Sequence, residues 1–255
     1  MRLDVLMVQK GVFSSRELAK VNIKKGNVLV NGVLCTKPSF EVSEDVSITL
    51  ITENVIPYVS RGGLKLEKAL KEFEINCKDF DVLDIGASTG GFTDCVLQHG
   101  ARRVYAMDVG TGQLSPTLKD DLRVKSIENT HIKDLTCDQV DSALFDLIVA
   151  DLSFISLTKV LEFFPKFLKP TGKAIVLIKP QFEVGASFVG KGGIVKDRKA
   201  HEMAIANVFN AAIKIGLYLT NITPSPIQDE RKNVEFLALL EQSQNGKSKF
   251  GSISN

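Results

Sequence analysis

The chain has 255 residues, of which 44% are apolar, and a formal net charge of +2 at neutral pH. This size allows one sizeable hydrophobic core and a small second unit. A net charge this close to zero excludes a chain that binds nucleic acid through its overall charge, so any such affinity must come from local basic patches.

The sequence shows no sign of a metal site, a disulfide or a membrane segment. The four cysteines lie far apart without a C-x-x-C pair, and the three histidines lack metal-ligand spacing. The first residues do not resemble a signal peptide, and no apolar run approaches the roughly 18 residues that span a bilayer. We therefore expect a soluble, cytoplasmic protein without a bound metal, and no protein partner is predicted.

The N-terminal part of the chain combines two short helices with a small hairpin. Apolar residues at helical spacing predict a helix over residues 2–8, and Ser14 or Ser15 can cap a second helix. Asn31-Gly32 between two apolar pairs is a strong hairpin signal. These elements predict a small α+β domain over residues 1–58.

Basic residues dominate the first part of this domain. Up to Lys37 they outnumber the acidic residues by seven to two, whereas residues 38–58 contain four acidic residues and no basic one. Basic side chains on two helices and a hairpin suit contacts to phosphate groups. A solvated helical face would have the same composition, so charge alone leaves both interpretations open.

The order of the residues in this domain resembles the S-four RNA-binding domain. The resemblance implies that structured RNA docks across the two helices and the hairpin turn, where it is recognised mainly by shape and by phosphate contacts. It rests on Arg2-Leu3-Asp4, Ser15-Arg16-Glu17-Leu18-Ala19, the run from Ile23 to Gly32, and Lys37-Pro38. The residues predicted to contact RNA, the last of them in the linker that follows, are Arg2, Ser15, Arg16, Lys20, Lys24, Lys25, Asn31 and Arg61.

A short glycine-containing linker at residues 59–63 leads into a second domain, residues 64–242, in which apolar strands alternate with helices. Such alternation predicts an α/β fold with a doubly wound, Rossmann-like sheet. Residues 243–255 are polar with Gly and Ser, and we expect a disordered tail there. The predicted strands are residues 81–85, 103–107, 123–127, 145–150, 173–178 and 234–240.

The first of these strands runs directly into a glycine-rich turn and a helix. Gly86, Gly90 and Gly91 lack a Cβ atom, so the backbone can bend sharply and a flat ligand can approach it closely. Asp108 ends the next strand, about where nucleoside-binding βαβ units place a carboxylate that binds ribose. The turn therefore predicts a ligand that contains a nucleoside; the alternative is an ordinary βα turn that binds nothing.

The spacing within the turn separates two kinds of ligand. A dinucleotide site has the pattern G-x-G-x-x-G, but here Ser88 stands two residues after Gly86, and Asp84 would repel a pyrophosphate. A cationic ligand that carries adenosine fits better, and S-adenosylmethionine (SAM) is such a ligand. The predicted cofactor-binding residues are Asp84, Gly86, Ser88, Gly90, Gly91, Phe92, Asp108, Asn129 and Thr130.

Four ionisable residues of this domain lie before, after or inside its predicted strands. Lys65 precedes the first strand, Asp151 and Lys179 follow two apolar runs, and Glu235 lies inside the last strand. Each of them by itself fits a structural ion pair, because a charge beside a buried strand needs a partner. Four of them at one edge, next to a cofactor turn, suit catalysis.

Two lysines and two carboxylates suit methyl transfer to a ribose 2′-hydroxyl. Transfer to carbon usually needs a nucleophilic cysteine, and transfer to a base amine usually shows Asp/Asn-Pro-Pro-Tyr, where this chain has Asp151-Leu152-Ser153-Phe154. A hydroxyl needs a base, and a lysine can serve when desolvation and a second cation lower its pKa. We predict Lys179 as the general base and Lys65 as the cation that steers the hydroxyl. Asp151 and Glu235 would orient the two lysines.

Five motifs resemble the TlyA group of the FtsJ-like methyltransferases, and with the N-terminal domain the resemblance covers about residues 1–241. It implies SAM-dependent 2′-O-methylation of cytidines in ribosomal RNA, and members are also labelled haemolysins. Matching motifs place the Lys-Asp-Lys-Glu tetrad of the family on Lys65, Asp151, Lys179 and Glu235. The motifs are Ser60-Arg61-Gly62-Gly63-Leu64-Lys65-Leu66, the glycine turn from Asp84 to Thr93, Asp108-Val109-Gly110-Thr111-Gly112-Gln113-Leu114, Asp151-Leu152-Ser153-Phe154-Ile155-Ser156-Leu157 and Ile178-Lys179-Pro180-Gln181-Phe182-Glu183.

The chain departs from the family pattern in three places. A Gly-rich turn usually precedes Asn-x-Glu-Phe, whereas residues 228–232 are polar and charged, so the loop before Glu235 is expected to be more mobile. Glu128-Asn129-Thr130-His131 replaces the commoner Glu-Arg-Thr-Asn, which affects the expected adenine contacts. Thr111 stands where a tyrosine or a histidine is often found.

Two other functions fit parts of the sequence. An RNA-binding assembly factor without catalysis would show a broken tetrad or cofactor turn, and a membrane-acting haemolysin would need a membrane-spanning pattern or an export signal. The sequence shows none of these signs. We therefore predict a SAM-dependent ribose methyltransferase whose partner is ribosomal RNA or a ribosomal subunit.

Overall fold

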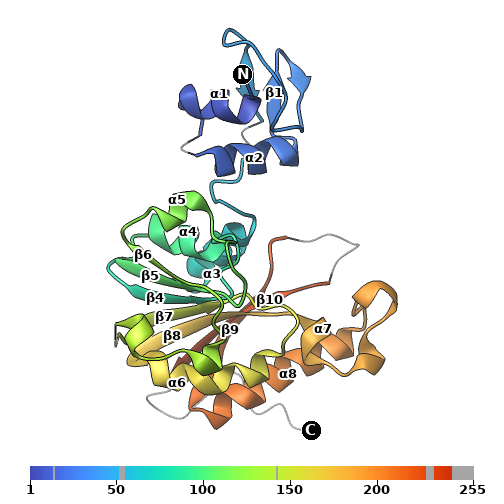
Figure 1. Ribbon diagram of the computed structural model, residues 1–255. Coiled ribbons are helices and arrows are strands. Elements are labelled where there is room, and N and C mark those ends of the chain that lie inside the picture. Colours follow the sequence, from blue (N-terminus) through green and yellow to red (C-terminus); the bar gives the residue numbers. More distant parts are fainter. Residues whose placement is uncertain (14, 52–54, 142, 228–232, 243–255) are drawn as a thin grey trace.

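The computed structural model consists of a small N-terminal part and a larger part that is built on one sheet (Figure 1). It describes residues 1–13, 15–51, 55–141, 143–227 and 233–242. None of the helices in these residues is both long and apolar enough to cross a membrane. The architecture agrees with the predicted fold class, an α/β sheet domain preceded by a small α+β domain.

In the N-terminal part, two helices pack on a three-stranded antiparallel sheet of order β2-β1-β3. The elements are α1 (Leu3–Gln9), α2 (Arg16–Lys25), β1 (Val28–Val30), β2 (Val33–Leu34) and β3 (Ile48–Leu50). Ser15 caps α2 by accepting a hydrogen bond from the Leu18 N–H, and Gly26 ends the helix with a left-handed backbone conformation. The predicted Asn31-Gly32 turn joins β1 and β2.

The segment between the two parts is anchored at both of its ends. The buried carboxamide of Asn22 donates a hydrogen bond to the Ile56 carbonyl (2.9 Å) and accepts one from the Ile56 N–H (2.8 Å). On the other side, Asp94 accepts a hydrogen bond from the Val59 N–H (2.8 Å). Residues 56–59 therefore connect α2 to the helix that follows the glycine turn.

The larger part is a seven-stranded sheet of order β6-β5-β4-β7-β8-β10-β9. Its strands are β4 (Asp81–Ile85), β5 (Arg103–Met107), β6 (Val124–Ile127), β7 (Phe145–Ala150), β8 (Leu168–Ile178), β9 (Leu217–Pro224) and β10 (Phe236–Gln242). The first five strands in the sheet order run parallel, and β10 is antiparallel to both of its neighbours. The strand order reverses between β4 and β7, and ligands of such sheets bind at this switch point.

Helices cover both faces of this sheet. They are α3 (Gly62–Glu72), α4 (Gly91–Gln98), α5 (Pro116–Lys119), α6 (Phe164–Phe167), α7 (Pro180–Glu183) and α8 (Arg198–Lys214), with several short 3-10 turns between them. Side chains alternate along a strand, so Leu83 and Tyr105 face the core under α8, whereas Val82 and Val104 face the core under α3 and α4. Figure 1 shows the N-terminal part beyond α4 and α5, with α8 on the opposite side of the sheet.

The end of the chain departs from the predicted strands. β8 begins earlier than predicted, and β9 is absent from the predicted strands because polar residues interrupt its apolar pattern. β10 begins at Phe236, so Glu235 directly precedes the strand instead of lying inside it. The loop at 228–232 and the predicted tail at 243–255 lie outside the described residues.

Candidate active site

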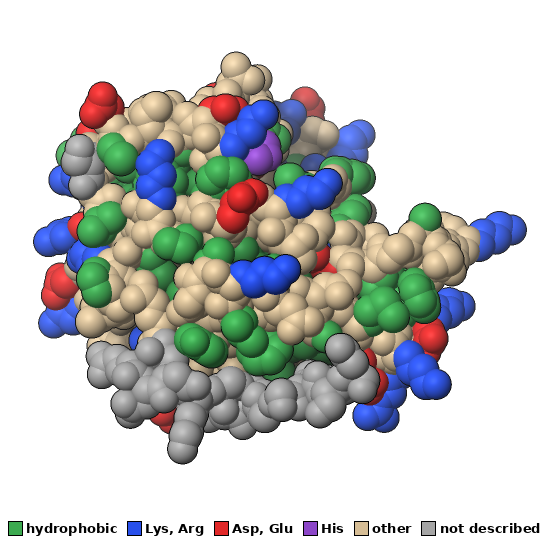
Figure 2. All heavy atoms as spheres, turned by 90° about the horizontal axis from the view of Figure 1, so that it is seen from below, with side chains coloured by type: hydrophobic (Ala, Val, Ile, Leu, Met, Phe, Trp, Pro, Cys, Tyr) green, Lys and Arg blue, Asp and Glu red, His purple; other side chains and the backbone are tan. Residues whose placement is uncertain are grey.

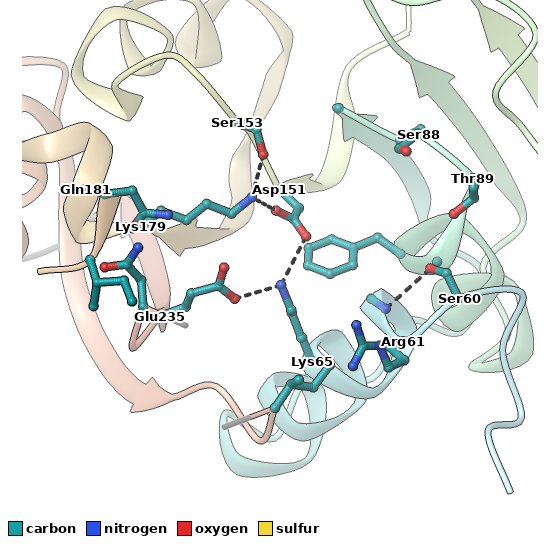
Figure 3. A pocket seen from close by; sticks show the side chains of 18 of the residues that line it. Ser60, Arg61, Lys65, Ser88, Thr89, Asp151, Ser153, Lys179, Gln181 and Glu235 are labelled. Atoms are coloured by element: carbon teal, nitrogen blue, oxygen red, sulfur yellow. Dashed lines mark hydrogen bonds and ion pairs between the residues drawn. The ribbon is translucent and has the colours of Figure 1, made fainter. Parts of the chain in front are cut away.

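The four predicted catalytic side chains meet at the carboxyl edge of the sheet (Figure 3). Lys65 lies on α3, Asp151 and Lys179 directly follow β7 and β8, and Glu235 directly precedes β10. Because β10 is antiparallel to β8 and its first residue pairs with the last residue of β8, the residue before β10 lies at the same edge as the residue after β8. The topology thus explains how groups far apart in the sequence converge.

Ion pairs connect the four groups in a chain of alternating charge. The Nζ atom of Lys65 lies 2.7 Å from a Glu235 oxygen and 3.5 Å from an Asp151 oxygen. The Nζ atom of Lys179 lies 2.6 Å from the other Asp151 oxygen. A largely buried charge costs free energy of desolvation unless it has partners. Here two cations face two anions, so the cluster is neutral as a whole.

Lys179 has a second partner, Ser153, which is not among the predicted site residues. Only 8% of this residue is exposed, and its Nζ atom donates a hydrogen bond to the Ser153 hydroxyl (2.9 Å). An ammonium group has three N–H donors, and Asp151 and Ser153 account for two of them among the described residues. The position of Ser153, two residues after Asp151 in the motif that follows β7, is the signal that could have identified it.

Two adjoining cavities open beside this cluster. The first has a volume of about 600 Å³ and is lined by the four charged residues. The second has a volume of about 450 Å³, contains Asp108 and is lined mainly by apolar surface. Gly86, Ser88, Asp151 and Ser153 line both cavities, which therefore form one cleft along the glycine turn.

Close backbone contacts explain two of the glycines in this turn. Gly86 has a φ of +83°, and a Cβ atom there would lie 2.8 Å from the Asp151 carbonyl oxygen. Gly91 packs so closely on the linker that a Cβ atom would overlap the Ser60 hydroxyl. The turn thus meets both the loop after β7 and the linker with no side chain between them.

Most of the predicted cofactor-binding residues line the cleft. They are Gly86, Ser88, Gly91, Phe92, Asp108 and Thr130. The carboxylate of Asp108 accepts hydrogen bonds from the backbone N–H groups of Ser88 and Gly110, each 2.8 Å long, which fix it against the turn. Asp84, Gly90 and Asn129 line neither cavity.

Asp84 lies behind the turn and is completely buried. One of its oxygens accepts a hydrogen bond from the Thr93 hydroxyl (2.6 Å), and the other finds no hydrogen-bond donor among the described residues. Burial raises the pKa of this carboxyl to about 7, although the Thr93 hydrogen bond acts in the opposite direction. Close to neutral pH, therefore, this group lies near the midpoint of its titration.

The raised pKa of Asp84 predicts a cost to stability that depends on pH. The unfolded chain loses this proton at about pH 4, but the folded protein keeps it until about pH 7. The free energy of unfolding therefore falls as pH rises between these two values and is level above them. Asp84→Asn removes the ionisation. We expect the melting temperature of the variant, relative to that of the wild-type protein, to increase from pH 5 to pH 7.5 in thermal scans. A difference that does not change with pH would contradict the raised pKa.

A buried carboxylate orients two of the predicted RNA-contacting arginines. Asp4 is fully buried, and oxygens of its side chain lie 2.9 Å from Arg2 and 3.1 Å from Arg16. The hydrogen bond from Arg2 is the largest cause that lowers the pKa of Asp4. Both arginine side chains keep nearly half of their surface exposed, so they are held in place and remain accessible. Lys20 forms a long ion pair of 3.9 Å with Glu17.

The other predicted RNA-contacting residues differ in their surroundings. Lys24 and Lys25 are exposed at the end of α2. The Ser15 hydroxyl is buried as the cap of that helix, and the side chain of Asn31 accepts a backbone hydrogen bond within the small sheet. Arg61 lies apart from them, because it lines the first cavity near Lys65 (Figure 3).

Two features of the site are visible only in the structure. Phe154 is 92% exposed and has a φ of +66°, a conformation that costs an aromatic residue about 1–2 kcal/mol. Its ring lies beside the second cavity, 5.6 Å from the ring of Phe182. Glu183 is buried and accepts hydrogen bonds from the Leu157 N–H (2.8 Å) and the Ser156 hydroxyl (2.6 Å), which ties α7 to the loop after β7.

Comparison with known proteins identifies the family. Residues 58–242 match the model of the FtsJ-like methyltransferases, and residues 1–48 match that of the S4 domain. The chain belongs to the FtsJ-like methyltransferase family. This membership agrees with the cleft, in which a glycine turn adjoins a lysine and carboxylate cluster.

Relatives of this methyltransferase resemble it over nearly their whole length. It is 43% identical to hemolysin A of Brachyspira hyodysenteriae, over 93% of this chain and 98% of that protein. It is 39% identical to the 16S/23S rRNA (cytidine-2′-O)-methyltransferase TlyA of Mycobacterium tuberculosis, over 94% of this chain and 89% of that protein. A solved structure from Streptococcus thermophilus, described as a hemolysin, is 40% identical and covers 99% of this chain and 92% of its own, with a TM-score of 0.76. The predicted membership of the TlyA group is confirmed.

Proposed function

We propose that this methyltransferase transfers the methyl group of SAM to the ribose 2′-hydroxyl of a cytidine in ribosomal RNA. The observation that carries the proposal is the chain of ion pairs from Lys179 through Asp151 and Lys65 to Glu235, at the junction of the two cavities. The name of the Mycobacterium tuberculosis relative supports the choice of nucleotide and of RNA. A ribosomal substrate would place the activity in the cytoplasm.

The residues of the cleft fit SAM. Asp108 is fixed by two backbone N–H groups and keeps lone pairs for ribose hydroxyls, beside an apolar surface that suits adenine. Gly86 permits close approach to the backbone, and the carboxylates of Asp108 and Asp151 line this part of the cleft, which favours a cation. When bound, SAM supplies an electrophilic methyl group on a sulfonium.

Lys179 is the proposed general base. In its neutral form, its Nζ atom would accept the proton that the 2′-hydroxyl loses as the ribose oxygen is methylated. Asp151 forms ion pairs with both lysines and so orients them toward each other. Lys65 attracts the developing oxyanion, and Glu235 holds Lys65 in place. Correct alignment of oxygen, carbon and sulfur supplies much of the rate.

The N-terminal part and Phe154 would both contact the RNA, the first at phosphate groups and the second at the target base. Arg2, which directly precedes α1, and the exposed basic side chains of α2 suit phosphate contacts. The outward ring of Phe154 suits stacking on the base of the target nucleotide, which contributes about 1–3 kcal/mol per base. A substrate contact would also account for the strained backbone of Phe154.

Transfer of tritium from labelled SAM to purified small and large ribosomal subunits that lack the modification tests the proposed function. We expect label in RNA, recovered in an alkali-resistant dinucleotide, because a 2′-O-methyl group blocks alkaline cleavage. Label in alkali-sensitive nucleotides would indicate base methylation instead. SAM binding without transfer to either subunit would favour an assembly role, and no SAM binding would exclude the enzyme.

Two lysines at the end of α2 provide a test of RNA docking that leaves Asp4 and its arginines intact. We expect Lys24→Ala with Lys25→Ala to weaken RNA binding and to reduce the slope of log affinity against log salt by about two, one for each lost phosphate contact. Filter binding at several salt concentrations measures this slope. Lys214→Ala, an exposed lysine at the end of α8, is the matched control. An unchanged slope in the double variant would show that RNA does not contact this end of α2.

A further inference from the structure

The loop at residues 190–195 forms one wall of the catalytic cleft. Gly192 and Ile194 line the same cavity as the four charged side chains. The segment that carries this loop projects from the side of the molecule beyond α7 (Figures 1 and 2). Gly192 and Gly193 both have a φ of +77°, and a Cβ atom at either of them would meet nothing within 4 Å among the described residues. Gly192 and Gly193 therefore do not hold the loop by packing, and other contacts must do so.

Two side chains hold Val195, the buried last residue of this loop. The Val195 N–H donates a hydrogen bond to Oδ1 of Asn233 (2.7 Å), and the Val195 carbonyl accepts one from Nε2 of His201 (2.9 Å). The Nδ2 atom of Asn233 also donates to the Gly193 carbonyl (2.8 Å). A single carboxamide thus binds the loop at two backbone positions and determines its direction.

Both of these side chains are linked to the residue that pairs with Lys65. Asn233 stands two residues before Glu235, and both residues line the cavity. The ring of His201 packs edge-on against Phe236, directly after Glu235, with ring centroids 5.8 Å apart. The loop and the segment that carries Glu235 are therefore joined on both sides of that residue.

We infer that Asn233 is a positioning residue of the methyltransferase site. Its carboxamide holds the 190–195 loop as a wall for the substrate RNA, and the same bonds keep Glu235 directed at Lys65, 2.7 Å away. The inference rests on the proposed function of the cleft. If Asn233 had only a local structural role, its replacement would leave the Glu235 segment and the turnover unchanged.

Hydrogen exchange of the free enzyme, followed by mass spectrometry, tests this coupling without RNA. In Asn233→Ala we expect the amides of residues 193–196 and 235–236 to exchange together, about tenfold faster than in the wild-type protein, the effect of about one hydrogen bond. Asn76→Ala is the control, because Asn76 also accepts a backbone N–H, in the exposed turn before β4 (3.0 Å). Faster exchange in residues 193–196 alone would overturn the link to Glu235, and no change in either segment would overturn the inference altogether.

Steady-state methylation adds a readout that loop packing alone would not move. We expect Asn233→Ala to lower kcat about tenfold and to leave the KM for SAM within about twofold. Asn233→Asp keeps the acceptor for Val195 but loses the donor for Gly193, so we expect its kcat to lie between those of the wild-type protein and the alanine variant. If the alanine variant does not fold, the aspartate variant and His201→Phe, which keeps a ring against Phe236, replace it. An unchanged kcat would overturn the inference, whereas failure of the wild-type enzyme to methylate RNA would count against the proposed function and leave the exchange test to decide.

Discussion

Replacing Lys179 with alanine is expected to lower kcat for methyl transfer about a thousandfold, the usual contribution of a general base. The variant should fold, because Asp151 keeps its ion pair with Lys65 when Lys179 is absent. SAM affinity, measured by calorimetry, should change little, since the glycine turn and Asp108 are untouched. Single-turnover transfer to RNA measures the chemical step separately from product release.

Lys179→Arg separates proton abstraction from charge. Arginine keeps the positive charge beside Asp151 but does not give up its proton. We therefore expect the arginine variant to be about as inactive as the alanine variant. Lys173→Ala is the matched control, because Lys173 lies on β8, the strand that Lys179 directly follows, and pairs with an acidic residue of β10 away from the cleft. Activity of the arginine variant within tenfold of the wild-type value would show that Lys179 acts through its charge and not as a base.

Replacing Gly86 with alanine is expected to weaken SAM binding and methyl transfer together, each at least about a hundredfold. The new Cβ atom would lie 2.8 Å from the Asp151 carbonyl oxygen and would have to be accommodated at a φ of +83°. The loop after β7 would shift, and with it Asp151, where a displacement of about 1 Å can cost a hundredfold in rate. Calorimetry with SAM and tritium transfer to RNA measure the two effects.

Gly216→Ala distinguishes the contact of Gly86 from the cost of its backbone conformation. Gly216 has a φ of +77°, and a Cβ atom there would meet nothing within 4 Å among the described residues. It lies between α8 and β9, so substitution adds the conformational cost without disturbing the cleft. We expect a lower melting temperature with normal SAM binding. Normal SAM binding by Gly86→Ala as well would show that the turn does not need close contact with the Asp151 carbonyl.

Local patterns in the sequence were sufficient to place the strands next to the site and the residues that end them. Alternating apolar runs predicted β4, β5 and β7 with the bounds that the structure shows. Because parallel strands present their carboxyl ends at one edge, the same patterns also predicted that Asp151 and Lys179 meet there. β9 was not predictable in this way, since its strand conformation depends on pairing with β10 more than on its own apolar pattern.

The sequence by itself determined the α/β fold class, the glycine turn and the four charged side chains of the candidate site, because strand periodicity, turn glycines and charged strand ends are local properties. The tertiary structure alone decided how those groups pair and which of them are buried. Asp84 lies behind the cleft with a raised pKa, and Asn233 reaches a loop that is distant in the sequence. Burial and hydrogen bonding of this kind depend on which segments pack together, and no local pattern of residues encodes that.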